Sequence, residues 1–71
     1  MNYVRYYVET EDGEPVGLSR VRRDENGIFG ENFLRGQWVD APRVVSLAMD
    51  PLWADQVSEA EAERIMKRLG G

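Results

Sequence analysis

Hydrophobic residues recur with the period of an α-helix near the end of the chain. They stand at i, i+3, i+4 and i+7, on one helical face, as Ala62, Ile65, Met66 and Leu69. Ser58 and Glu61 form an S-x-x-E capping box before them, and glycines follow at positions 70 and 71. The pattern predicts an amphipathic helix over residues 58–69, whose apolar face must be covered by the rest of the chain.

The first half of the chain alternates with the period of a strand and is rich in aromatic and β-branched residues. Clusters of Gly, Asp, Asn and Arg interrupt it where turns are expected. The predicted strands cover residues 3–9, 15–22, 28–34 and 37–39. Neighbours along the chain are antiparallel in this arrangement, and Trp38 is expected to lie across from Phe33.

The first hairpin sets which residues face the helix. A three-residue loop, Glu11-Asp12-Gly13, is predicted, because a two-residue turn would set Arg5 against Arg20. The three-residue loop places Tyr6 opposite Leu18. One face of the sheet is then apolar and is expected to receive the helix. Its residues are Val4, Tyr6, Val8, Val16 and Leu18. The opposite sheet face is then expected to point outward.

Residues 40–57 give a weaker pattern. Pro42 is suited to the first turn of a short helix over residues 42–49, and a fifth strand over residues 43–49 is the alternative. Trp53 is expected to pack beneath the loop that follows. The prediction is a single α+β domain over residues 1–71, with a three- to four-stranded antiparallel meander packed on one C-terminal helix.

Composition limits the chemistry of this small acidic chain. Its 71 residues carry a net charge of −4 and include no cysteine and no histidine. Disulfides, Cys or His metal ligands and a histidine base are therefore excluded. Neither a phosphate-binding loop nor a calcium loop is present, because Arg35 stands where the calcium loop starting at Asp24 needs Glu. We expect no enzymatic activity, no cofactor and no metal.

The location follows from what the chain lacks. No charged leader precedes an apolar run at the N-terminus, and no segment approaches the roughly 18 apolar residues of a membrane span. We therefore expect a cytoplasmic protein without membrane contact.

Aromatic and arginine side chains on the outward sheet face are the candidate partner-binding residues. They are Tyr3, Arg5, Tyr7, Val21 and Arg23. Tyr and Arg are enriched at protein interfaces, and open strand edges invite pairing. We expect a protein partner or a homodimer. Single-stranded nucleic acid is the alternative ligand of the same face, with the arginines at positions 20, 22 and 23 on the neighbouring strand. The charge of −4 and the absence of an RNA-binding signature disfavour it, and the arginines are expected instead to pair with the glutamates at positions 9, 25 and 31.

Two resemblances concern the chain as a whole and its end. The segments GEPVGLSR, FLRGQWVDAP and VSEAEAERIM resemble short uncharacterised proteins of actinobacteria and their phages, which implies the fold but no established activity; a phage-encoded regulatory role would suit this size. The terminal Gly70-Gly71 resembles the tail of ubiquitin-like modifiers and sulfur carriers. In those proteins a strand precedes the glycines, whereas here the predicted helix does, so helix termination is the simpler interpretation.

Overall fold

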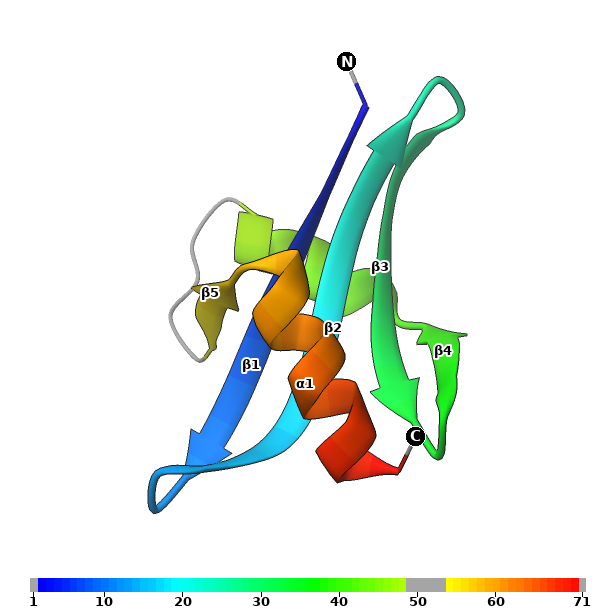
Figure 1. Cartoon of the computed structure of the whole chain (residues 1–71). Coiled ribbons are helices and arrows are strands. Elements are labelled where there is room, and N and C mark those ends of the chain that lie inside the picture. The colour runs from blue at the N-terminus through cyan, green and yellow to red at the C-terminus, as the bar shows by residue number, and fades with distance from the viewer. Residues whose placement is uncertain (1, 49–53, 71) are drawn as a thin grey trace.

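The computed structural model describes residues 2–48 and 54–70 of the chain. Its elements, in order, are β1 (Tyr3–Glu11), β2 (Glu14–Asp24), β3 (Gly27–Leu34), β4 (Gln37–Asp40), the 3-10 helix η1 (Pro42–Ala48), β5 (Asp55–Val57) and α1 (Glu59–Leu69). The strands form one antiparallel sheet in the order β4-β3-β2-β1-β5 (Figure 1). This confirms the predicted α+β fold and adds β5, an edge strand that the sequence did not predict.

Two-residue turns join β1 to β2 and β3 to β4. Both have positive φ at the two central residues, 52° and 81° at Asp12-Gly13 and at Arg35-Gly36, as type I′ hairpins require. The predicted three-residue loop after β1 is therefore wrong. A bulge supplies the extra residue instead. Glu9 pairs with Gly17 and Thr10 with Pro15, so Val16 of β2 has no partner, and Arg5 faces Val21 and not another arginine.

The bulge moves the pairing by two residues from the predicted register. Val8 lies opposite Leu18, and Tyr6 lies opposite Arg20. Over residues 3–9 and 17–23 this shift of two residues keeps the side chains on their predicted sheet faces, because side chains alternate with a period of two. Phe33 pairs with Trp38 on the neighbouring hairpin, as predicted.

Helix α1 covers part of one sheet face, called here the α1 side. Its N-cap is confirmed, since the Ser58 hydroxyl accepts a hydrogen bond from the Glu61 N–H at 3.1 Å. The buried cluster beneath the helix consists of Val8, Leu18, Phe33, Ala62 and Ile65. Val4 and Val16, however, are 49% and 51% exposed, so their expected place in the core is wrong. Val4 lies near the start of β1, opposite Arg22, and Val16 is the residue of β2 that the bulge leaves without a partner.

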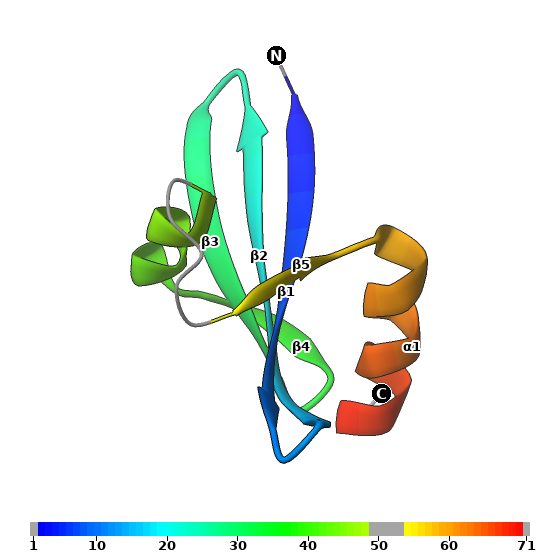
Figure 2. The ribbon, with the colours of Figure 1, turned by 90° about the vertical axis from the view of Figure 1, so that its left-hand side faces the viewer.

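The opposite sheet face, called here the η1 side, is not left open (Figure 2). The 3-10 helix and Ala54 close a second buried cluster of Tyr7, Val21, Val44, Leu47 and Ala54. The predicted short helix is confirmed over Pro42–Ala48, and the alternative of a strand there is wrong. Trp53 and its expected packing lie outside the described residues.

The close approach of η1 depends on one glycine of β3. A Cβ atom added to Gly30 would lie 2.5 Å from the carbonyl oxygen of Ala41 and 2.9 Å from the Val44 Cβ. The Ala41 N–H donates to the Gly30 carbonyl oxygen at 2.8 Å. Only a residue without a side chain lets this backbone rest on the sheet.

Among the described residues, no helix is long and apolar enough to cross a membrane.

Candidate interaction surface

The five predicted partner-binding residues lie together, as the sequence suggested. Across β1 and β2, Tyr3 pairs with Arg23 and Arg5 with Val21, while Tyr7 follows two residues along β1. Residues that pair directly, or lie two apart in one strand, share a sheet face. The five side chains therefore lie on one sheet face, the η1 side.

Two of these residues are not accessible to a partner. Tyr7 is 1% exposed and Val21 is 0% exposed, because η1 and Ala54 pack over both side chains. The expectation that this sheet face points outward is wrong at these two positions. The reason is the 3-10 helix, which supplies a second apolar layer.

The other three residues are less covered, although Tyr3 packs against the edge of the same cluster. Arg5 and Arg23 are exposed and Tyr3 is half-buried. The Arg5 guanidinium carbon lies 4.6 Å above the centre of the Tyr3 ring, a cation–π distance. Partner binding by this remaining trio stays a prediction.

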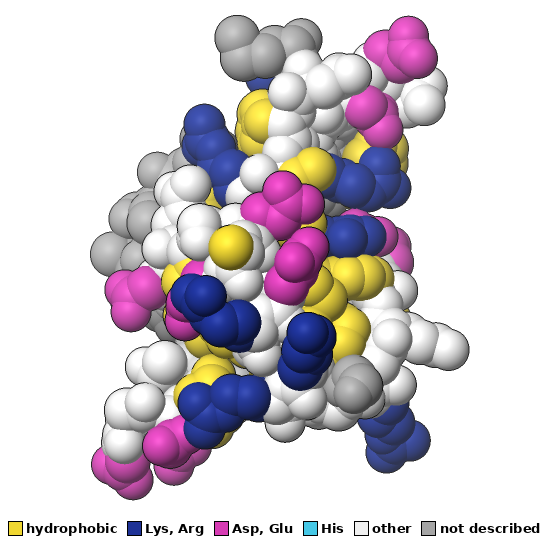
Figure 3. Space-filling view, in the orientation of Figure 1, with side chains coloured by type: hydrophobic (Ala, Val, Ile, Leu, Met, Phe, Trp, Pro, Cys, Tyr) yellow, Lys and Arg dark blue, Asp and Glu magenta, His cyan; other side chains and the backbone are white. Residues whose placement is uncertain are grey.

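A denser group of arginines and aromatic rings lies on the α1 side, beside the helix. We call it the Arg–aromatic surface, and it consists of Arg20, Arg22, Phe29, Glu31 and Trp38. Figure 3 shows dark blue basic side chains next to yellow hydrophobic ones in this region, to the right of the helix. The surface occupies the part of the α1 side that the helix leaves uncovered.

Each arginine of this surface lies against an aromatic ring. The guanidinium carbon of Arg20 is 4.1 Å from the centre of the Trp38 ring, and that of Arg22 is 4.7 Å from the Phe29 ring. Trp38 also packs on Phe33, with ring centres 5.2 Å apart. The stacking therefore links Arg20, through Trp38, to the buried cluster beneath α1.

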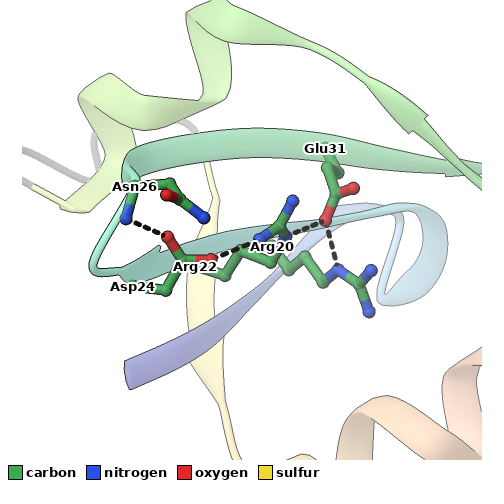
Figure 4. Close-up of polar contacts among 5 residues, drawn as sticks. All are labelled: Arg20, Arg22, Asp24, Asn26 and Glu31. Atoms are coloured by element: carbon green, nitrogen blue, oxygen red, sulfur yellow. Dashed lines mark hydrogen bonds and ion pairs between the residues drawn. The ribbon is translucent and has the colours of Figure 1, made fainter. Parts of the chain in front are cut away.

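One glutamate joins the two arginines (Figure 4). Glu31 Oε1 accepts hydrogen bonds from Arg20 Nε at 2.7 Å and from Arg22 Nε at 3.3 Å. Arg22 Nη1 donates to Asp24 Oδ2 at 3.0 Å. Within residues 2–48 and 54–70, the Nη atoms of Arg20 have no hydrogen-bond partner. They are the donors that this network leaves for a ligand.

The electrostatics of this network keep Glu31 ionised. Its side chain is only 15% exposed, and this burial would raise the pKa. The hydrogen bonds and positive charges of Arg20 and Arg22 outweigh that effect, so the pKa of Glu31 lies below its usual value. Two arginines and two carboxylates, Glu31 and Asp24, balance in charge.

Register explains why the sequence did not identify this surface. Arg20 and Arg22 alternate with Val21, so they belong to the opposite face from the predicted group. The expectation that Glu31 pairs with arginines is confirmed for Arg20 and Arg22, but on the α1 side of the sheet, and their stacking on Trp38 and Phe29 was not predicted. The described residues also hold no group of three or more side chains suited to a metal ion.

Comparison with known proteins adds no relative. No family model matches the chain, and no curated protein or solved structure is significantly similar to it.

Proposed function

We propose that this chain is a small non-enzymatic interaction or regulatory module that binds a protein partner through the Arg–aromatic surface. The observation that carries the proposal is the stacking of Arg20 on Trp38 and of Arg22 on Phe29, both held by Glu31. Arginine and tryptophan are the residue types that most often dominate the binding energy of protein interfaces.

Preorganisation supports this assignment. A free arginine side chain loses rotamer entropy when a partner fixes it, and that loss weakens binding. Arg20 and Arg22 are already held by hydrogen bonds and by the rings beneath them, so less freedom remains to be lost. The Nη donors of Arg20 and the exposed part of Trp38 then offer a polar and an apolar contact side by side.

Charge favours a protein over a nucleic acid as the ligand. Phosphate binding draws its affinity from uncompensated Lys and Arg, whereas Glu31 and Asp24 neutralise the arginines here. The net charge of the chain is −4.

A carrier role for the Gly-Gly tail gains no support from the structure. Gly70 acts as the C-cap of α1 and donates its N–H to the Met66 carbonyl oxygen.

The test compares alanine substitution of an arginine on the surface with that of an arginine outside it. The wild-type chain is used to capture proteins from an extract of its source organism, and the captured protein is then titrated with Arg22→Ala and Arg64→Ala variants. Arg22 belongs to the surface, whereas Arg64 lies on the outer side of α1 with a 70% exposed side chain. We expect Arg22→Ala to weaken binding about 30-fold or more, as loss of an interface arginine does.

The outcomes separate the alternatives. Equal binding by the two variants, with unchanged melting temperatures, would contradict the proposal. Titration of single-stranded RNA and DNA at two salt concentrations tests the other ligand class. Tight, salt-dependent binding that Arg22→Ala abolishes would assign the surface to nucleic acid instead.

A further inference from the structure

Strand β4 forms one outer edge of the sheet (Figure 1). It pairs with β3 on one side, and no described strand pairs with its other side. An open edge presents unpaired backbone N–H and C=O groups, which another strand can satisfy. Lysine often protects such edges, but the only lysine of this chain is Lys67, in α1.

The direction of the backbone groups along β4 can be assigned. The Ala41 N–H points toward β3, since it donates to the Gly30 carbonyl oxygen. Backbone groups alternate in direction along a strand of an antiparallel pair. Gln37 and Val39 therefore also turn toward β3, and Trp38 and Asp40 turn their N–H and C=O groups to the open side.

We propose that a second copy of the chain pairs with this edge, with β4 antiparallel to β4 and the twofold axis beside Val39. In this register Trp38 of each copy lies opposite Asp40 of the other. Such a pair exchanges two hydrogen bonds, and symmetry repeats it. Every outward N–H and C=O group of Trp38 and Asp40 then has a partner.

The side chains of this register are complementary as well. The two copies of Val39, which is 43% exposed, meet as a non-hydrogen-bonded pair, where side chains approach most closely. On the α1 side, Asp40 of one copy faces Trp38 of the other, whose ring carries Arg20. Arg20 has Nη donors available, and Asp40 lies opposite the like-charged Glu31 in its own chain. The dimer gives Asp40 an opposite charge.

The neighbouring register satisfies fewer groups. A twofold axis beside Trp38 would form one reciprocal Trp38 pair and would set Asp40 opposite Gly36, in the turn. The outward groups of Asp40 would then lack strand partners. Of these two registers, hydrogen bonding and charge both favour the axis at Val39.

This self-association goes beyond the proposed function and does not depend on it. The dimer occupies Arg20 and Trp38, which face Asp40 of the other copy, so Arg22 and Phe29 are the part of the Arg–aromatic surface that stays free for a partner, on β2 and β3 away from the edge. The dimer places two Arg–aromatic surfaces on one continuous sheet. An edge of four residues, about 14 Å long, makes the association dependent on protein concentration.

Sedimentation velocity from micromolar protein to about 1 mM tests the dimer, since even weak association is populated there. We expect a species of twice the chain mass to increase with concentration. Val39→Lys should weaken dimerisation at least about tenfold, because like charges would meet across the axis. Val16→Lys is the matched control, since Val16 is similarly exposed but lies on β2.

Amide hydrogen exchange checks the register. The N–H groups of Trp38 and Asp40 should become protected as concentration rises, while those of Gln37 and Val39 stay unchanged within the hairpin. A wild-type chain that remains monomeric to about 1 mM would overturn the proposal. So would equal dimerisation by the two lysine variants, or unchanged exchange at Trp38 and Asp40. Loss of partner binding in Arg22→Ala bears only on the proposed function.

Discussion

The two faces of the sheet are covered by different means. On the α1 side, an eleven-residue amphipathic helix rests on Val8, Leu18 and Phe33 and leaves Val4 exposed. On the η1 side, a seven-residue 3-10 helix buries Tyr7 to 1% and the other large side chains to 2% or less. The shorter element therefore makes the tighter contact.

The difference comes from how closely each element approaches the strands. Gly30 lets the backbone of η1 lie directly against β3, whereas α1 is held off by its own side chains and by those of the sheet. Helices pack at 8–10 Å through interdigitated side chains, in general about a side-chain layer away. The space beside α1 is where the arginines lie on aromatic rings, so the looser face is the one that carries the proposed interaction surface.

The largest predicted effect tests the tight face. Tyr7→Ala should destabilise the fold by about 3–5 kcal/mol, because it opens a cavity beneath η1. A domain of this size has a free energy of unfolding of only about 4–10 kcal/mol. Tyr3→Ala, on the same face but half-buried, should cost about 1 kcal/mol. Urea unfolding measures both.

Equal losses of unfolding free energy in the two tyrosine variants would contradict the conclusion that η1 buries Tyr7 much more completely than Tyr3. A small loss of unfolding free energy in Tyr7→Ala would mean that the Tyr7 side chain is accessible after all. The burial of Tyr7 also means that this variant is unsuitable as a test of partner binding, since unfolding alone would remove the partner.

A smaller effect tests the close approach itself. Gly30→Ala should cost about 1–3 kcal/mol, because the added methyl group meets backbone atoms of Ala41 and Val45 that cannot simply rotate away. Gly17→Ala is the matched control on β2. Its Cβ would lie 3.6 Å from the nearest atom, Glu9 Oε2, so its stability should change by no more than about 0.5 kcal/mol. Equal effects in thermal unfolding would argue against this account of η1.

The sequence predicted what depends on local periodicity and on turn chemistry. The stripe of α1, its Ser58 cap and the Phe33–Trp38 pair are confirmed, because each follows from residues close together in the chain. The face on which Tyr3, Arg5 and Tyr7 lie was also predicted correctly, since alternation survives a shift of two residues.

What escaped prediction depends on contacts distant in sequence. The bulge at Val16, opposite Glu9 and Thr10, holds the extra residue that the sequence placed in the turn. The burial of Tyr7 requires η1 to cross the sheet. Gly30 permits this packing, but a glycine in a strand does not by itself predict it. The Arg–aromatic surface likewise requires the register of β2 against β3. None of these is encoded in a window of a few residues.

The smallest predicted effect concerns the looser face and depends on pH. Glu31→Gln keeps a hydrogen-bond acceptor beside Arg20 and removes the charge, so it should cost about 1 kcal/mol or less near neutral pH. Because the folded-state pKa of Glu31 is lowered, its contribution is complete above the ordinary value of 4.5 and is lost as the pH falls through the lower folded value.

The difference in unfolding free energy between wild type and Glu31→Gln should therefore shrink as the pH falls below 4.5. Glu25→Gln, in the exposed β2–β3 turn, controls for the loss of one negative charge. A difference that stays constant or grows on acidification would show that the Glu31 charge does not hold Arg20 and Arg22. The losses caused by Gly30→Ala come from packing, so the same titration should leave them nearly unchanged. The two faces would then differ in kind, one held by apolar contact and the other ordered in part by ionised groups.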